Sequence, residues 1–475
     1  MWELQVSSGK GPYTTAFRSS GDLRNVVKTI ADLPDSFSHA LHVTTNDREF
    51  EVTARNVIML LYILTSLDGG KVGLDGSKQD VTTLDEVAES LIHIWYSAYI
   101  KAELLYWLQS AVKPLLTKFV EQIASKETGA LIDKTWTFPG GSSLQVVLRK
   151  EEWLRLEKFL DLPHGLDLER AREIRASTML APERMDYRHR WYYKDASPPL
   201  RLAKQRFRED GLLLPFGHPR DGFDVPNPTF FQTLGRWPMD DKADPLDGWP
   251  IEDIEQTVSP AVNDLYGKLA VYLRRTFSKM LERLTTVKVH FQTYNMDAKD
   301  LPGHLKEHSY ARIEVSNISD AGYIGTRGTL ALLSPLLQTR SHNPHATVIT
   351  LYLNAVREML RWSREENKMP DLGLIAQSLP PVDPFRLSSL EGADFYRMWD
   401  SRTLVLDVDK YFKMRGFAQV SRDTGMVMKE AGTLVNEWPT RLKRGPGRDE
   451  AREFRLLLAS NFSGMERYVE WERRE

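Results

Sequence analysis

The chain has 475 residues, no cysteine and a formal net charge of −2 at pH 7. Its length predicts two or three domains, and the lack of cysteine excludes disulfides, thiolate nucleophiles and cysteine-ligated zinc or iron–sulfur sites. The sequence opens without a basic and apolar leader, and its longest apolar run, 57–64, is far shorter than the ~20 residues of a membrane span. We therefore expect a cytoplasmic protein that does not enter a membrane.

The first 70 residues predict a βαβα arrangement. A short strand at 4–6 and a loop around Gly21 precede a helix, whose apolar residues recur at helical spacing from 23 to 33 and which Pro34 ends. Residues 39–44 alternate as in a strand, and 52–67 are apolar nearly all round, as in a buried helix.

The middle of the chain is mostly helical and then rich in turns. From 83 to about 126 the pattern is helical, with a kink expected at Pro114, and Gly140 and Gly141 punctuate a hairpin-like segment. A basic helical stretch follows, then proline- and glycine-rich residues at 215–250 and a helix at 259–284. A turn-rich segment of this length within a compact protein is usually functional.

Three strands, at 287–294, 311–318 and 346–353, are separated by helical patterns and predict a parallel sheet. From 361 the tail is charged and helical, with a basic link at 441–448. The predicted fold is α/β: a degenerate Rossmann-like, methyltransferase-like parallel sheet with a large helical and loop insertion and a helical C-terminal region. The predicted domains are a core of 1–135 and 286–360, an insertion of 136–285 and a C-terminal region of 361–475.

A loop with Gly21 and Asp22 lies between a predicted strand and a helix, where backbone amides and a helix N-terminus attract anions. Asp47 follows the next strand, at the place where an acid commonly holds a ribose, and Asp297 follows a later strand in a similar place. Together they predict a pocket for S-adenosylmethionine, real or vestigial, although no GxGxxG is present. The alternative is an ordinary strand–helix turn with capping aspartates.

A basic and aromatic segment runs from 170 to 208. Cations neutralise phosphates and aromatic faces stack on unpaired bases, so the segment predicts RNA contact. The alternative is a solvated amphipathic helix whose aromatic residues belong to the core. The predicted RNA contacts are Arg184, Arg188, Arg190, Trp191, Lys194, Arg201 and Lys204.

Asp240, Asp241 and Asp244 form an acidic cluster between Pro238 and Pro245. Close carboxylates can bind a cation, hold a guanidinium bidentately or share a proton as a general base. The flanking prolines disfavour a long helix with a magnesium-binding acidic face, and a solvent-exposed acidic loop is the alternative. No histidine pair has a metal-binding frame, so we expect no metal site, and there is no GxSxG nucleophile motif.

Several long strings together resemble a fungal family that shares its uncharacterised N-terminal domain with dynein axonemal assembly factor three and with some MYND-finger proteins. The finger itself is absent, because the chain has no cysteine. The strings are GDLRNVVKTIADLP (21–34), NDREFEVTARNVIMLLYIL (46–64), RFREDGLLLPFGHPRDGFDVPNPTFF (206–231), DPLDGW (244–249), ARIEVSNISDAGYIG (311–325) and HATVITLYLNAV (345–356).

Within that family the chain resembles the arginine-containing cyclodipeptide synthases of fungal secondary metabolism. The resemblance implies an aminoacyltransferase that joins arginine, from arginyl-tRNA, to a second amino acid, from another aminoacyl-tRNA, in a diketopiperazine. No cofactor is required for that reaction. The branch is associated with a DDxxE motif, whose nearest match here is Asp240-Asp241-x-x-Asp244, with Asp449-Glu450-x-x-Glu453 as a rival.

This reading predicts that Asp240, Asp241 and Asp244 capture the guanidinium of arginine or deprotonate an amine, while the basic segment holds the tRNA acceptor ends. Two other classes stay open. A methyltransferase would need Gly21, Asp22, Asp47 and Asp297 to line one pocket, and an assembly-factor-like scaffold would show a stable protein partner and no turnover.

Overall fold

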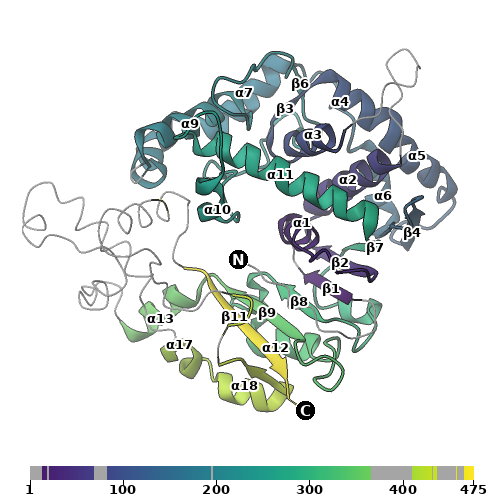
Figure 1. Cartoon of the computed structure of the whole chain (residues 1–475), viewed down its shortest axis with the longest axis vertical. Coiled ribbons are helices and arrows are strands. Elements are labelled where there is room, and N and C mark those ends of the chain that lie inside the picture. The colour runs from purple at the N-terminus through teal and green to yellow at the C-terminus, as the bar shows by residue number, and fades with distance from the viewer. Residues whose placement is uncertain are drawn as a thin grey trace, which may run out of the picture. The chain divides into compact units, whose positions relative to one another are not determined.

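The computed structural model describes residues 13–18, 21–68, 83–193, 196–364, 409–430, 432–435, 456 and 465–474. The fold is mixed α/β, and the chain forms two compact units (Figure 1). The larger unit comprises 11–13 and 21–298, and the smaller unit comprises 1–10, 14–20 and 299–475. The observed division differs from the predicted one, because the predicted insertion lies in the same unit as most of the N-terminal part of the core.

The larger unit contains a four-stranded sheet in the order β2-β7-β5-β4. β7 pairs in parallel with β2, from Leu41 opposite Val289 to Asp47 opposite Asn295, and in parallel with β5. β4 and β5 form an antiparallel hairpin around Gly141, whose φ of +81° suits glycine. The strands are β2 (Leu41–Asp47), β4 (Leu131–Thr137), β5 (Ser143–Arg149) and β7 (Val289–Asn295), and a separate pair joins β3 (Tyr99–Ile100) to β6 (Val225–Pro226).

Helices make up most of the larger unit, and the long helix α11 contacts α1, α2, α3, α9 and α10 (Figure 1). The helices are α1 (Arg24–Ala31), α2 (Phe50–Leu67), α3 (Leu84–Tyr96), α4 (Ala102–Trp107), α5 (Lys113–Gln122), α6 (Lys150–Lys158), α7 (Leu168–Met179), α8 (Met185–Tyr187), α9 (Pro198–Asp210), α10 (Ile251–Gln256) and α11 (Leu265–Thr286). Shorter helical segments are η1 (Leu108–Val112), η2 (Pro182–Arg184) and η3 (Arg188–Tyr192).

Local sequence explains several helix ends. Thr83 and Glu86 form a capping box at the start of α3, with each side chain accepting from the other residue's backbone amide. Asp264 accepts from the amide of Gly267 at the start of α11. α9 begins at Pro198 and ends before Gly211, whose φ is +71°.

The helix α2 is long and apolar enough to cross a membrane by length and composition, and 67% of it is buried within the protein. Buried apolar residues point to every side of this helix, as the nearly uniform apolar pattern predicts. Its position in the larger unit is that of a core helix.

The smaller unit has five strands in the order β10-β11-β9-β8-β1, with β1–β8 and β8–β9 parallel and the two outer pairs antiparallel. Its apolar core gathers side chains of β8, β9, α12 and α18 around Trp471. The elements are β1 (Tyr13–Arg18), η4 (Leu301–His304), β8 (Arg312–Val315), η5 (Asn317–Ser319), α12 (Gly325–Leu333), β9 (Thr347–Tyr352), α13 (Ala355–Ser363), α17 (Asp409–Met414), α18 (Phe417–Thr424), β10 (Met426–Met428) and β11 (Arg467–Arg473).

Two predictions of local structure are corrected. The C-terminal region is not wholly helical, because β10 and β11 extend the sheet beside β9, where Trp471 is completely buried. The helical pattern after residue 83 is also broken, because the chain turns at Ser97 into β3 before α4 begins. The predicted strand at 4–6 and the basic link at 441–448 lie outside the described residues.

Candidate functional site

A cavity of about 380 Å³ lies within the larger unit. This volume is within the range of ~300–1,000 Å³ that is typical of small-molecule sites. The loop before α1, the helices α2, α3, α7 and α9, and the segment 230–247 supply its walls. The residues that line it are Gly21, Asp22, Arg24, Val52, Arg55, Asn56, Met59, Trp95, Tyr96, Arg175, Met179, Phe207, Phe230, Trp237, Met239, Ala243, Asp244, Pro245 and Asp247.

The Gly21 loop is fixed by hydrogen bonds from both neighbouring elements. The amide of Gly21 donates to Oδ2 of Asp47 at 3.1 Å, and its carbonyl accepts from Nδ2 of Asn56 at 2.9 Å. Gly21 has a φ of +57°, which favours glycine. Burial raises the pKa of Asp47 above its usual value, although the bonded amides act in the opposite direction.

The structure divides the four residues of the predicted cofactor pocket. Gly21 and Asp22 line the cavity, whereas Asp47 and Asp297 do not. Asp47 uses its carboxylate to hold the amides of Gly21 and Glu49. The structure therefore places Gly21 and Asp22 in the lining of this cavity, but not Asp47 and Asp297.

Asp22 and Arg24 form an ion pair at the N-terminus of α1. Oδ1 of Asp22 accepts from both the side-chain Nε of Arg24 at 2.8 Å and its backbone amide at 3.1 Å. Nη1 of Arg24 donates to the carbonyl of Asp247, which ties α1 to the acidic segment. Burial opposes the charge of Arg24, but the pairing with Asp22 outweighs it and raises the pKa of Arg24.

Arg55 projects from α2 into the cavity and has no carboxylate partner within ion-pair distance among the described residues. Its Nη2 donates to the carbonyl of Trp95 at 2.7 Å, at the end of α3, and its guanidinium lies 3.8 Å from the centre of the Phe230 ring. The surrounding protein removes water and lowers the pKa of Arg55 to about 10, although Asp22 acts through space in the opposite direction.

Arg175 on α7 is buried and serves as a cap for α9. Its two terminal nitrogens donate to the carbonyls of Phe207 and Arg208, both at 2.6 Å. Its guanidinium also lies 5.4 Å from the centre of the Trp237 ring. Burial lowers the pKa of Arg175 to about 10.

The acidic cluster is divided: the side chains of Asp240 and Asp241 share a hydrogen bond, whereas Asp244 pairs elsewhere. Asp240 is exposed, with its nearest cation, Lys242, at 3.7 Å. Asp241 is gripped by both Nε and Nη2 of Arg184 at 2.9 Å, and this bidentate bond overcomes burial to keep the pKa of Asp241 below its usual value. Asp244 is completely buried with Lys204 at 3.1 Å, and despite burial this lysine holds the pKa of Asp244 low.

The predicted acidic and basic motifs are thus partners of each other, which the sequence did not reveal. Arg184 and Lys204 hold Asp241 and Asp244. Arg188 is buried and donates to the carbonyl of Ala181 at 2.7 Å. Lys204 and Arg188 therefore cannot meet a phosphate in this conformation, which corrects their predicted contact with tRNA.

The remaining residues of the basic segment differ in exposure. Arg190 and Arg201 are exposed, and Nε of Arg201 donates to the carbonyl of Ala196 at 2.9 Å. Lys194 and the side chain of Trp191 lie outside the described residues, as does the rival acidic match at 449–453.

Sequence reasoning missed the residues that complete the cavity. Arg55 lies near the start of the largely apolar helix α2, and a cation directly before its buried apolar run is the signal that could have marked it. Tyr96 accepts a hydrogen bond from Nε1 of Trp249 at 2.7 Å, and burial raises the pKa of Tyr96. No local pattern links Tyr96 to a residue 153 positions away.

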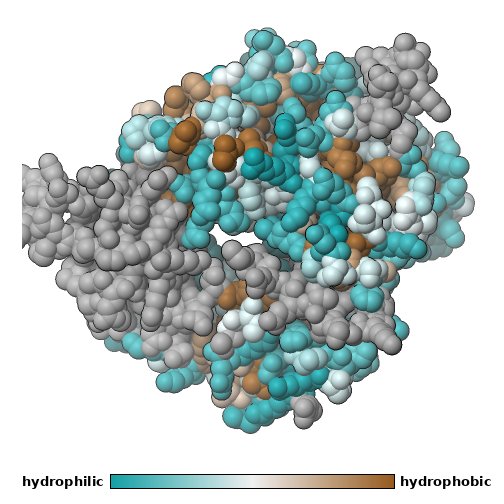
Figure 2. Space-filling view, viewed as in Figure 1, coloured by the Kyte–Doolittle hydropathy of each residue, from teal (hydrophilic) through white to brown (hydrophobic). Residues whose placement is uncertain are grey.

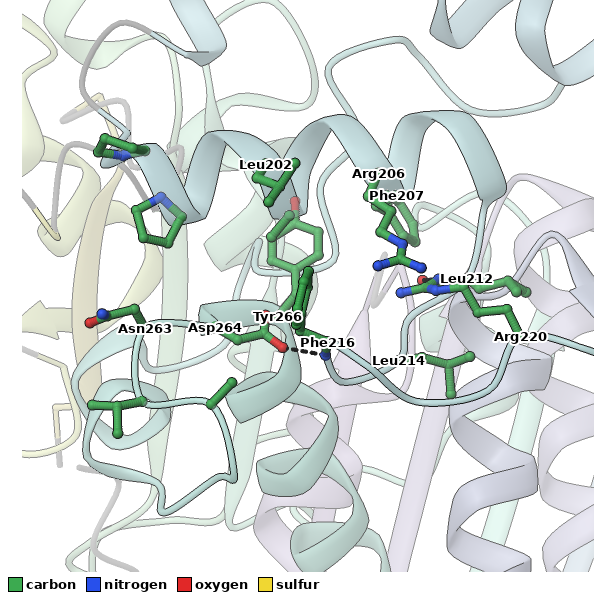
Figure 3. Close-up of a pocket in the computed structure, with 15 residues that line it drawn as sticks. Leu202, Arg206, Phe207, Leu212, Leu214, Phe216, Arg220, Asn263, Asp264 and Tyr266 are labelled. Carbon is green, nitrogen blue, oxygen red and sulfur yellow. Dashed lines mark hydrogen bonds between the residues drawn. The ribbon is translucent and has the colours of Figure 1, made fainter.

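A second pocket of about 510 Å³ lies between α9 and the start of α11 (Figure 3). Arg206 and Arg220 both pair with Asp210, and Oδ2 of Asp264 accepts from the amide of Phe216 at 2.6 Å. Hydrophobic atoms are exposed on the α9 side of the larger unit (Figure 2), where Leu202 is 57% exposed. Because its charged groups already pair with each other, this apolar pocket offers less chemistry than the cavity beside Gly21.

Within the described part of the chain, no group of three or more His, Cys, Asp or Glu side chains is placed to hold a metal ion. The acid–base groups that line the cavity are Asp22, Asp244, Asp247 and Tyr96, together with the guanidiniums of three arginines.

A family model described as a domain of unknown function, DUF4470, matches residues 3–100. This match confirms an uncharacterised domain in the N-terminal part of the chain. No curated protein and no solved structure matches the chain. The matched segment carries Gly21, Asp22, Arg55 and Tyr96, so it supplies one side of the cavity.

Proposed function

We propose that the chain is a tRNA-dependent cyclodipeptide synthase, which joins arginine and a second amino acid from aminoacyl-tRNAs, and that the cavity beside Gly21 receives an aminoacyl group. The observation that carries this proposal is the combination of charges in the cavity. Acidic residues from two distant segments, Asp22 and Asp247, line the same cavity as Arg55, together with several aromatic residues. An aminoacyl group of arginine presents cations, a polar carbonyl and an apolar stem, which this lining complements.

The reaction class does not require a nucleophile from the protein. Among the described residues that line the cavity, none is a serine, threonine, cysteine, lysine or histidine. An aminoacyl ester is already activated, so the amine of one substrate can attack the ester carbonyl of the other directly, and the ester oxygen leaves with the tRNA. A second attack of the same kind closes the ring. Holding the two groups in position can supply several kcal/mol, ~7 or more in well-oriented cases.

Within this proposal Asp22 replaces the acidic cluster as the cation-binding carboxylate. Asp241 and Asp244 already hold Arg184 and Lys204, and Asp240 is outside the cavity lining. The exposed Arg190 and Arg201 remain candidates for contact with the tRNA backbone. Because charged tRNAs are consumed, the proposed location is the cytoplasm.

Expression in a bacterial host followed by mass spectrometry tests the proposal. We expect an arginine-containing diketopiperazine in extracts, and in a lysate assay its formation should stop when RNase is added. Asp22→Asn should reduce the product at least ~10-fold, because the loss of a charged hydrogen-bond partner costs about 1.5–3 kcal/mol.

Asp240→Asn is the matched control, because Asp240 is an exposed carboxylate outside the cavity. It should leave the product unchanged. Product loss in Asp240→Asn, with full activity in Asp22→Asn, would move the reaction to the acidic cluster. No product in the presence of charged tRNAs would discard the synthase.

One observation favours a second candidate, a methyltransferase with a Rossmann-like core. The Gly21 loop opens on the cavity directly before α1, and β2 and β7 are parallel, as in a Rossmann half. The engagement of Asp47 by Gly21 counts against it. Calorimetry with S-adenosylmethionine decides, since micromolar binding would favour the methyltransferase. A stable protein partner without turnover or cofactor binding would instead favour a scaffold.

A further inference from the structure

The charges of the cavity are unequally satisfied. Asp22 pairs with Arg24 through one of its two carboxylate oxygens, and Asp244 pairs with Lys204. Among the described residues, the partners of Arg55 are backbone carbonyls and an aromatic face. A guanidinium that is half-buried without a carboxylate is unfavourable unless a ligand or water completes its shell.

Two of the three donor nitrogens of Arg55 have no hydrogen-bond partner among the described residues. Nη2 is used by the end of α3, whereas Nη1 and Nε make no hydrogen bond to the described residues. Neither nitrogen is sealed off from solvent, unlike Nε of Arg175. The guanidinium plane is held against Phe230, so its donors are already oriented.

Asp22 has the opposite charge on the same cavity. Both hydrogen bonds from Arg24 fall on Oδ1, and Oδ2 accepts no hydrogen bond from the described residues. Asp22 and Arg55 do not form an ion pair with each other, yet the Asp22 charge acts on Arg55 through space. Two residues that line the same cavity therefore carry a free acceptor and free donors, with respect to the described residues, and do not pair with each other.

We propose that this cavity binds a zwitterionic amino-acid group, with Oδ2 of Asp22 receiving its cationic amine or guanidinium and Nη1 and Nε of Arg55 receiving its carboxylate or carbonyl oxygen. This inference deepens the proposed function by placing the substrate. In an aminoacyl ester, the donors of Arg55 meet the carbonyl oxygen, on which negative charge develops during attack by an amine.

Calorimetry on the full-length protein tests the inference without tRNA or turnover. The probes are L-arginine and agmatine, which share a guanidinium and a cationic centre but differ in the carboxylate. We expect L-arginine to bind more tightly than agmatine. Arg55→Gln should weaken the binding of L-arginine by about 10- to 100-fold and change the affinity for agmatine by less than ~3-fold, because only the carboxylate contact is removed.

Arg48→Gln is the matched control, since Arg48 is an arginine close to the start of α2 that is 74% exposed and pairs only with Glu49. It should leave both affinities unchanged. A purely structural role of Arg55 would weaken both probes equally, which would overturn the inference. A variant that fails to fold is detected by circular dichroism, and Arg55→Lys then replaces it, with the carboxylate preference reduced but retained.

Two further results separate this inference from the synthase. Arg55-dependent binding of L-arginine without any diketopiperazine would retain the amino-acid site and reject the synthase. Diketopiperazine formation with an unchanged KM in Arg55→Gln would retain the synthase and reject this site. If inorganic phosphate or adenosine monophosphate binds and L-arginine does not, and that binding depends on Arg55, the proposal of a zwitterionic ligand is overturned and the cavity is a phosphate site.

Discussion

Lys204 and Asp244 show what a buried ion pair does for a segment without regular structure. Both side chains are essentially inaccessible, and Asp244 also accepts from the amide of Leu246 at 2.9 Å. Removing one partner of such a pair leaves a buried charge without compensation. The pair therefore fastens the proline-rich segment to α9.

Lys204→Met should destabilise the larger unit by about 3 kcal/mol, because it leaves the Asp244 carboxylate uncompensated in the interior. The double variant Lys204→Met/Asp244→Asn should recover most of that loss, since asparagine keeps the acceptor for Leu246 and carries no charge. The free energy of unfolding from urea titration followed by tryptophan fluorescence measures both.

Lys242→Met provides the control at the same cluster, because Lys242 is 65% exposed and lies 3.7 Å from Asp240. Its effect should stay below about 0.5 kcal/mol. An equal loss in Lys204→Met and Lys242→Met would contradict the buried role of Lys204.

At this scale the sequence predicted only part of the site. Gly21, Asp22 and Asp244 were found because loop glycines and clustered acids are local signals. Arg55 and Tyr96 were missed because their role depends on Phe230 and Trp249, which reach them only through tertiary packing. The pairing of Arg184 with Asp241 spans 57 positions and is equally invisible to local pattern.

Among the elements, the end of α9 is held by two features that a sequence pattern shows only in part. Gly211 follows the helix with a φ of +71°. The guanidinium of Arg175 is fixed in place, because it donates hydrogen bonds to the last carbonyls of the helix. A Cβ at Gly211 would lie 2.7 Å from Cβ of Ala98 and 3.0 Å from Arg175. The glycine is required both by its conformation and by the close approach of α7.

Gly211→Ala should therefore destabilise the larger unit by more than ~2 kcal/mol. Placing alanine in the left-handed backbone conformation costs ~1 kcal/mol, and the steric clash of its Cβ adds to that cost. Gly222→Ala is the control, because Gly222 has a similar φ of +82° and no atom within 4 Å of the added Cβ. It should lose about 1 kcal/mol. Thermal unfolding by circular dichroism compares the two, and equal losses would remove the packing argument.

The sequence predicted well those helices and strands whose apolar residues recur with a clear period. It did not predict which strands pair with each other. The strands β2, β7, β8 and β9 and the helices α1, α2 and α11 all fall close to their predicted ranges. β4 and β5 were expected only as a hairpin, because the parallel pairing of β5 with β7 joins residues 147 positions apart. β11 was missed because its partner β9 lies more than a hundred residues earlier.

For the molecule as a whole, the buried His93 makes stability depend on pH. Burial lowers the pKa of His93 to about 3, with Lys101 and His218 adding to the shift, and Nδ1 of His93 lies 2.9 Å from Oγ of Ser97. The unfolded chain takes up this proton near pH 6.5, whereas the folded chain does not. The contribution of His93 to the free energy of unfolding is therefore fully present above pH 6.5 and is lost progressively as the pH drops toward 3.

His93→Asn should remove this contribution while keeping a polar contact for Ser97. Below pH 6.5 the wild type should lose about 1.4 kcal/mol of unfolding free energy per pH unit relative to His93→Asn. Urea titrations at pH 7.5, 6.0 and 5.0 measure it. Parallel curves for the two proteins would show that another group controls the acid response.

The walls of the cavity also come from two different parts of the chain. The matched domain, 3–100, contributes Asp22 and Arg55, whereas Arg175, Phe230 and Asp247 come from beyond it. In the amino-acid site that we propose, both charged contacts therefore come from the matched domain, and the opposite wall comes from the rest of the chain. We expect substitutions in that wall to change which side chain is accepted while the two charged anchors stay in place.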